Sequence, residues 1–459
     1  MTHKENTPPS MGPVAIRAVI GLSGIYAFRM LGLFMILPVF TLYGTALPGY
    51  TATLAGLAIG IYGLTQALLQ IPFGFLSDRI GRKPVIAMGL TLFAVGSAVA
   101  GTADSMVEVI IGRALQGSGA VSAAVLALAA DLTPEEHRTK AMATIGMTIG
   151  VAFFASLILG PIVAGQHGLA GIFWLTTLFA LCGLAILFFY VPTPASSSVH
   201  REAEAVPELF GRVLSDGRLL RLDGGILILH AIMTATFVAL PPLLGGHMPG
   251  ADHWMVYLGV LTLSVVFMVP FVIIAEKHRR MRPVFVGAVV VMGLAQVGFY
   301  ATGHSLAGLA ATLVVYFAAV NVLEAALPSL VSRVAPAHSK GTALGVYSSS
   351  QFMGAFLGGV LGGLILDHGG IAQVFLLGAG AAGVWLLLAL TMRFPEHLSS
   401  RLLSVGRLPQ VEAGALATRL GRVPGVAEAV VVGDEGIAYL KVDHRTLDED
   451  ALAQAAGHG

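Results

Sequence analysis

Long apolar runs alternate with short loops along most of the chain. A helix needs about 20 mostly apolar residues to cross a bilayer, and most of these runs reach that length. Only 11% of the 459 residues are charged, whereas a soluble domain carries about a quarter. A soluble fold would lack the polar surface to cover such a chain. We therefore expect an all-α membrane protein with about twelve spanning helices.

The runs fall into two groups, separated by a polar stretch. They lie at about 17–44, 52–76, 82–102, 106–130, 138–165 and 169–193, and then at about 222–246, 254–276, 282–303, 305–332, 340–366 and 370–393. We expect two bundles of six helices each. The predicted regions are an N-terminal tail at 1–16, an N-terminal bundle at 17–193, a linker at 194–221, a C-terminal bundle at 222–393, a short linker at 394–400 and a tail domain at 401–459.

Lysine and arginine occupy alternate loops. They are absent near 44–51, 101–105, 166–168, 247–253, 301–306 and 367–370 and cluster in the loops between. The positive-inside rule places the cation-bearing loops in the cytoplasm. We therefore expect a multi-pass protein of the bacterial inner membrane with both termini cytoplasmic.

Several classes of function are disfavoured. The net charge of +1 gives no reason to expect nucleic-acid binding. Cys182 is the single cysteine, so an intrachain disulfide is impossible and a thiolate metal site is disfavoured. No nucleophile–base set, metal cluster or phosphate loop stands out. We expect no cofactor, no bound metal and no enzymatic activity.

The two halves of the chain repeat one another. "DLTPEEHRTKAMA" after the fourth run resembles "SRVAPAHSKGTAL" after the tenth, and Gly160 and Gly362 match at the same offset. Duplicated bundles of this kind form transporters with a substrate path between the halves.

The loop between the second and third runs reads "GFLSDRIGRKP". Gly74 allows close helix approach, Gly81 suits a tight turn, and Asp78 can accept hydrogen bonds from the exposed amides of a helix start. With the repeat, this loop makes the chain resemble the major facilitator superfamily, and within it the YajR-type inner-membrane transporters. These resemble drug/proton antiporters and carry a C-terminal ferredoxin-like domain.

The resemblance implies a role for the loop. The aspartate that matches Asp78 meets the start of the eleventh span, which is near Lys340 to Leu344 in this sequence. It thereby latches the cytoplasmic side shut. The matching latch residues are Gly74, Asp78, Arg79, Gly81, Arg82 and Lys83. The alternative is that the basic residues only anchor the loop to lipid phosphates.

Two further motifs carry the resemblance. "RALQGSG" holds Arg113 and Gln116 in the fourth span, and the family's matching arginine is linked to proton coupling. The alternative is a structural arginine bonded to backbone carbonyls or to Gln116. "GVAFFASLILGPIVAG" resembles the antiporter motif of the fifth span, where small residues allow tight packing and proline kinks the helix. Its matching residues are Gly150, Gly160, Pro161 and Gly165, while Met147 departs from the pattern.

Other polar residues lie at membrane depth, where burying a charge is costly and points to function. Arg29 lies in the first span, His230 in the seventh, and Asn321 and Glu324 share one face of the tenth. Glu324 suits a reversible proton carrier, because hydrocarbon favours its neutral form. The alternatives are a structural carboxylate or a pair with Arg29. Asp131 and Arg138 lie in the loop after the fourth span and match a family loop that suggests a cytoplasmic gate or a structural role.

The pattern changes after residue 400. "RLLSV" predicts a strand, "EAGALATRLGRVPG" a helix, "VAEAVVVGDEGIAYLKVD" a hairpin that turns at Gly433 to Gly436, and "LDEDALAQAAG" a second helix. This is a ferredoxin-like unit without its last strand. Regulation, self-association, ligand sensing and simple stabilisation of the cytoplasmic face all remain open for it.

Taken together, the residues and the resemblance predict proton-coupled efflux of small, including hydrophobic or drug-like, molecules by alternating access. Uptake by proton symport or facilitated diffusion is one alternative. A membrane sensor that signals through the tail domain is another. The expected partners are a small-molecule substrate, protons and the lipid bilayer.

Overall fold

The computed structural model describes residues 11–194, 207–336, 339–392, 399–434, 436–443 and 445–457. Within them, eleven helices are long and apolar enough to cross a membrane. One of these, α7 (Glu135–Phe189), accounts for two of the predicted spans, because Gly168 breaks it with φ 63° and ψ −166°. The expected architecture of about twelve spans is therefore confirmed.

The helices follow the predicted runs closely. In the N-terminal half they are α1 (Pro13–Phe34), α2 (Phe40–Tyr43), α3 (Ala52–Ile80), α4 (Arg82–Gly101), α5 (Met106–Ser118), α6 (Ser122–Leu132) and α7. In the C-terminal half they are α8 (Phe210–Ser215), α9 (Gly217–Gly245), α10 (His253–Glu276), α11 (Met281–Thr302), α12 (Leu306–Val334), α13 (Lys340–Gly369) and α14 (Ile371–Leu390). The short helix α8 and the first turn of α9 occupy part of the stretch that the sequence predicts as a linker.

Local chemistry explains where many helices begin. Thr51, Ser105 and Ser305 each accept a backbone N–H of the following turn with their hydroxyl oxygens, at the starts of α3, α5 and α12. Gly81 separates α3 from α4 with φ 96°, a conformation that side chains with a Cβ rarely adopt. The turn predicted at Gly81 is therefore present.

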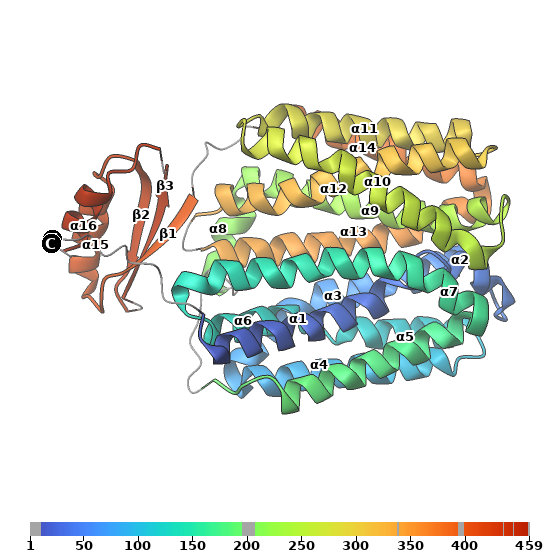
Figure 1. Cartoon of the computed structure of the whole chain (residues 1–459), viewed down its shortest axis with the longest axis horizontal. Coiled ribbons are helices and arrows are strands. Elements are labelled where there is room, and N and C mark those ends of the chain that lie inside the picture. Colours follow the sequence, from blue (N-terminus) through green and yellow to red (C-terminus); the bar gives the residue numbers. More distant parts are fainter. Residues whose placement is uncertain are drawn as a thin grey trace.

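The long helices lie side by side in two groups, with the small tail domain at one end (Figure 1). We call the end of the bundles that faces this domain the tail-side end and the opposite end, next to α2, the far end. Helices α1 to α7 form the N-terminal bundle, and α9 to α14 form the C-terminal bundle.

The tail domain has the predicted order of strands and helices. It comprises β1 (Ser399–Ser404), α15 (Gln410–Leu420), β2 (Val426–Val432), β3 (Ile437–Val442) and α16 (Glu449–Ala456). The strands form an antiparallel sheet in the order β1-β3-β2. Leu416, Leu440 and Leu452 belong to its core, which the two helices close on one face of the sheet. This arrangement is consistent with a ferredoxin-like domain.

Candidate functional site

The two bundles meet closely at the far end. Gly165 of α7 faces Ala251 of the other bundle, where an added Cβ would lie 2.6 Å from the alanine methyl. Leu42 packs against Gly245, at 3.1 Å from an added Cβ, and also against Gly250. The interface between the bundles is therefore closed at this end.

Toward the tail-side end, α7 has glycines without a close neighbour. An added Cβ at Gly146 or Gly150 would meet nothing within 4 Å. Met147 and Val151 on the same stretch are 70% and 65% exposed. Gly160, in contrast, packs with an added Cβ 2.5 Å from the carbonyl oxygen of Met35. The tight packing expected of the antiporter motif is thus present at Gly160 and Gly165 and absent at Gly150 among the described residues, while Pro161 lies within the helix.

Three residues of the predicted latch and gate form one cluster at the tail-side end. The guanidinium of Arg82 pairs with the carboxylate of Asp78 and lies 3.5 Å from that of Asp131. It also donates to the hydroxyl of Ser77 at 2.8 Å. The side chains of Arg82 and Asp131 are only 2% and 1% exposed. The loop motif is therefore bonded to the end of α6 rather than lying free.

The remaining latch and gate residues differ in their surroundings. Lys83 donates to the carbonyl of Val191 at 2.7 Å and so binds the segment just after α7, whereas Arg79 is exposed. Gly74 faces the methyl group of Ala123, which lies 3.3 Å from an added Cβ. The Nε atom of Arg138 is buried and lacks a hydrogen-bond partner within the described residues.

Two arginines lie deep in the N-terminal bundle near the same aromatic ring. Arg29 and Arg113 are each 1% exposed, and their guanidinium carbons lie 6.0 and 5.0 Å from the ring centre of Tyr62. Such cation–π contacts lower the cost of burying a cation. Two of the predicted coupling residues are thus brought near one ring, which belongs to a tyrosine that sequence reasoning did not single out.

Both guanidinium groups also donate hydrogen bonds. Arg29 bonds the hydroxyl of Ser122 at 3.2 Å and the amide oxygen of Gln66. Arg113 bonds the carbonyl of Ala58 at 3.2 Å and the amide oxygen of Gln116 at 2.8 Å. The hydrogen-bond partners expected if Arg113 has only a structural role, a backbone carbonyl and Gln116, are therefore present. The Nε atom of Arg29 and one terminal nitrogen of Arg113 have no hydrogen-bond partner in the described structure.

A second polar cluster lies in the C-terminal bundle. The Nδ1 atom of His230 on α9 lies 3.3 Å from a carboxylate oxygen of Glu324 on α12. The Nε2 atom of the same ring lies 2.6 Å from the amide nitrogen of Gln351 on α13. With Gln351 donating, Nε2 accepts and the ring proton resides on Nδ1, which lies near Glu324 but makes no hydrogen bond within the described residues. Glu324 therefore faces His230 and not Arg29.

Solvent access differs between the two members of this pair. The side chain of Glu324 is 36% exposed and that of His230 is 9% exposed. Asn321, one turn earlier on α12, instead donates to the hydroxyl of Ser264 on α10 at 3.2 Å. Sequence reasoning placed Asn321 and Glu324 on one face, but they bond to different neighbouring helices.

Sequence reasoning missed further polar residues of the C-terminal bundle. Asp223 on α9 is 6% exposed, and one of its carboxylate oxygens has no hydrogen-bond partner among the described residues. It was overlooked because it lies at the edge of the polar linker stretch. Gln351 was overlooked because a lone glutamine in an apolar run gives no signal until the fold shows its neighbour.

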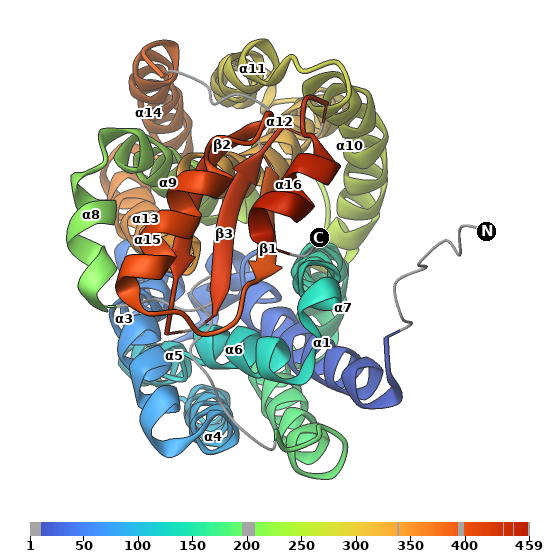
Figure 2. The same ribbon diagram turned by 90° about the vertical axis from the view of Figure 1, so that its left-hand side faces the viewer.

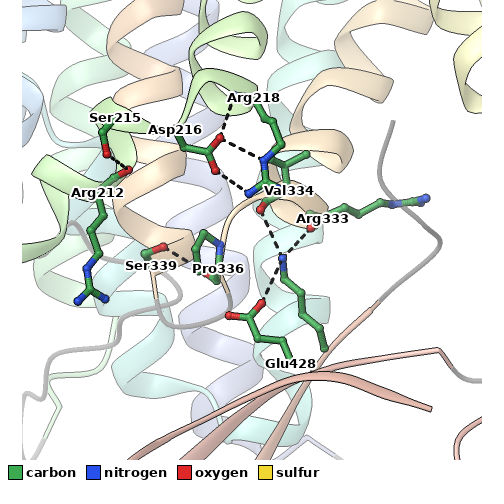
Figure 3. A network of polar contacts seen from close by, with 10 residues as sticks. Arg212, Ser215, Asp216, Arg218, Arg333, Val334, Pro336, Ser339 and Glu428 are labelled. Atoms are coloured by element: carbon green, nitrogen blue, oxygen red, sulfur yellow. Dashed lines mark hydrogen bonds and ion pairs between the residues drawn. The ribbon is translucent and has the colours of Figure 1, made fainter. Parts of the chain in front are cut away.

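The tail domain is docked on the C-terminal bundle through one lysine of β3. The ammonium of Lys441 donates to the carbonyls of Arg333 and Val334 at 2.7 and 3.4 Å, and lies 3.8 Å from the carboxylate of Glu428. Figure 3 labels these three partners. These carbonyls belong to the last two residues of α12, where the helix dipole favours a cation. The domain therefore forms the C-terminal cap of α12.

A second contact joins the tail domain to the same bundle. Arg279, between α10 and α11, lies 3.6 Å from the carboxylate of Asp443. Viewed along the bundles, the sheet lies in front of the tail-side end, across the line between the two halves (Figure 2). The uncovered face of the sheet, which carries Tyr439 and Lys441 at 3% and 6% exposure, is thus the docking face.

Known proteins agree with this architecture. A family model described as the Major Facilitator Superfamily matches residues 22–272 and 222–424. The chain is 45% identical to the inner membrane transport protein YajR of Escherichia coli (strain K12), over 97% of this chain and 98% of that protein. It is 27% identical to the multidrug resistance protein MdtH of Aeromonas hydrophila, over 81% of this chain and 94% of that protein.

Solved structures show the same fold. A bacterial homolog of the human lysosomal transporter Spinster, in an inward-facing and unoccupied conformation, matches with a TM-score of 0.64 and 15% identity, over 82% of this chain and 95% of that one. The human organic anion transporter MFSD10 matches with a TM-score of 0.58 and 20% identity, over 82% and 100%. This chain therefore belongs to the Major Facilitator Superfamily and is a multi-pass transporter of the inner membrane.

Proposed function

We propose that the chain exports small molecules in exchange for protons, by alternating access between its two bundles. The observation that carries the proposal is the contact of Glu324 with His230. A carboxyl and an imidazole this close can exchange a proton after a small side-chain rotation, and the side chain of Glu324 is 36% exposed. The likeness to MdtH, which is named for multidrug resistance, supports export over uptake.

The proposed cycle places the tail-side end in the cytoplasm, as the distribution of cations favours. In the conformation open to the outside, Glu324 takes up a proton. In the conformation open to the cytoplasm, it releases that proton through the exposed side of its carboxylate, and a substrate molecule binds. Because only differential binding shifts a conformational equilibrium, the exchange of proton for substrate is what drives the return.

Inverted membrane vesicles test both the direction and the coupling. A proton gradient, acid inside, is imposed and followed with a quenched acridine dye while a panel of cationic, neutral and anionic compounds is added. An exported substrate releases the quenching as protons leave and accumulates in the vesicle. A symporter would move substrate and proton the same way, and a sensor would move neither. Glu324→Gln should abolish the release, while Glu108→Gln, at the far-end start of α5, should preserve it.

We also propose that the tail domain regulates this transport. The support is its position: Lys441 caps α12 immediately before the segment that leads into α13. A domain fixed there moves with the C-terminal bundle and adds to the cost of any movement between α12 and α13. Full-length and tail-deleted proteins should therefore show different transport rates in the vesicle assay, whereas a purely stabilising tail would change only the amount of folded protein.

A further inference from the structure

An acidic residue of one bundle holds the start of a helix of the other bundle at the far end. Asp367 lies in the last turn of α13, and its carboxylate accepts the backbone N–H groups of Ala52 and Thr53 at 2.8 and 2.7 Å. It also accepts the hydroxyl of Thr53. These amides belong to the first turn of α3, where helix N–H groups lack intrahelical partners and the dipole favours an anion.

The two helices joined by this contact run antiparallel and pack closely along much of their length. An added Cβ at Gly60 would lie 2.8 Å from the carbonyl oxygen of Phe356, and one at Gly63 would lie 2.5 Å from that of Phe352. Farther along, the amide nitrogen of Gln70 donates to the hydroxyl of Ser349 at 2.6 Å. Successive turns toward the C-terminus of α3 therefore contact successive turns toward the N-terminus of α13.

This register has a consequence at the opposite end of the pair. Asp78 lies about two turns beyond Gln70 on α3. Continued over those turns, the register places Asp78 opposite the start of α13, which begins at Lys340. Each helix therefore carries an aspartate near its C-terminal end, at the level of the N-terminal end of the other helix. In this structure, Asp367 is bonded to its partner helix, while Asp78 is bonded to Arg82.

The conformation of the bundles agrees with which of the two aspartates is bonded to the other helix. The bundles are in contact at the far end, through Gly165 with Ala251 and Leu42 with Gly250. Toward the tail-side end, Gly146 and Gly150 of α7 meet no such neighbour among the described residues, and Met147 between them is exposed. The carboxylate cap that is formed is therefore the one at the closed end.

We propose that Asp367 is a positioning residue of the transport cycle, a latch that holds the far end closed and must release α3 before that end can open. Asp78 is its counterpart at the tail-side end, so that closing one end is coupled to freeing the other carboxylate. The proposal holds for either direction of transport and for any coupling ion. It therefore stands or falls separately from proton-coupled export.

The test is a distance measurement between spin labels on purified, full-length protein in lipid nanodiscs, which needs no substrate. Cys182 is replaced by alanine, and labels are placed at Asp104→Cys and His304→Cys, in the far-end loops of the two bundles. Double electron–electron resonance then reports the populations with the far end closed and open. Removal of a helix cap typically changes such a ratio by about 5- to 30-fold. We expect Asp367→Ala to shift the ratio by that amount toward the open, longer distance.

Two variants control for charge and for general damage. Asp252→Ala removes an acid at the same end whose side chain caps no helix, and it should leave the distances unchanged. Asp367→Asn keeps one oxygen for the amides of α3 but loses the charge, and it should give a smaller shift in the same direction. It also supplies the measurement if the alanine variant is not recovered as folded protein.

Replacement of the tail-side aspartate, Asp78, should change the far-end distances in the opposite direction. Asp78→Ala should increase the closed population at the far end, and the double variant with Asp367→Ala should fall between the two single variants. The proposal is overturned if folded Asp367→Ala and Asp367→Asn proteins keep the wild-type distances. It is also overturned if Asp78→Ala opens the far end as Asp367→Ala does.

Discussion

The imidazole of His230 lies 3.3 Å from the carboxylate of Glu324, and this contact joins α9 to α12 inside the C-terminal bundle. The two residues are distant in the sequence, and neither lies in the motifs by which the family resemblance is recognised. If this pair exchanges a proton, as we propose, proton transfer acts directly on the contact between these two helices.

Replacement of Glu324 by glutamine should remove the pH dependence of transport. Glutamine keeps the size and a hydrogen-bonding oxygen for His230 but cannot take up a proton. In vesicles, residual exchange of substrate for substrate should persist while uphill accumulation is lost. His230→Gln should instead retain accumulation with a displaced pH profile, because the carboxyl remains. A wild-type pH profile in Glu324→Gln would show that the proton is carried elsewhere.

Loss of the lysine cap should loosen the tail domain from α12. Lys441→Met keeps the apolar stem but removes three N–H donors, and hydrogen bonds from a charged group typically contribute about 1.5–3 kcal/mol. Hydrogen exchange should therefore quicken by about tenfold or more in the peptides that cover 328–336 and 437–443. Arg422→Met, an exposed change in the same domain, is the control. Equal protection in both variants would mean that other contacts hold the domain.

Docking of the tail domain should also depend on pH in the alkaline range. Burial lowers the pKa of Lys441 from its ordinary value of 10.5. The detached domain, with this lysine in water, therefore binds more protons than the docked one between the lowered pKa and 10.5. Docking should strengthen as the pH rises through that window and weaken as it falls back. The same exchange measurement at two alkaline pH values checks the sign, and Lys441→Met should show no such change.

The guanidinium of Arg82 should be important for stability as well as for conformational change. It pairs with Asp78 and lies close to Asp131, whose side chain is 1% exposed. Removal of one member of a buried ion pair typically costs about 3–5 kcal/mol, because a charge is left without compensation. Arg82→Ala should therefore lower the melting temperature in detergent. Arg82→Ala with Asp131→Asn should recover part of the loss, and no recovery would contradict a direct electrostatic cause.

Close packing of α3 on α13 can be tested with one methyl group. A Cβ at Gly359 would overlap the carbonyl oxygen of Gly56, so Gly359→Ala must push the helices apart. Overpacking of this kind typically costs about 1–3 kcal/mol. The melting temperature should fall, whereas Gly259→Ala, where an added Cβ meets nothing within 4 Å, should be neutral. Equal stability of the two variants would show that α3 and α13 can move apart by the width of a methyl group at little cost.

The span pattern and the tail domain were predictable because both rest on local sequence. Apolar length determines a span, and strand alternation with Gly433 and Gly436 defines the hairpin of the tail. The break at Gly168 is also local: a glycine between two apolar runs suits the positive φ that it adopts. These features need no knowledge of which helices are neighbours.

The partners of the polar residues could not be predicted, because they depend on helix packing across long sequence separations. Tyr62 near Arg29 and Arg113, and His230 beside Glu324, become visible only once the helices are placed. Asp367 was missed for a different reason. An acid at the end of a spanning helix is ordinarily read as facing water, whereas this one is bonded to α3.

The two arginines near Tyr62 have a consequence for the energetics of the membrane. Arginine stays charged at every physiological pH, and in the described residues of the N-terminal bundle the carboxylates lie only near helix ends. The proposed proton-exchanging pair, His230 with Glu324, belongs to the other bundle, as does the buried Asp223. A transmembrane voltage, worth about 2.3 kcal/mol per charge at 100 mV, therefore acts on the first half of the molecule as a constant force. On the second half, the force would change with the proton occupancy of these acids.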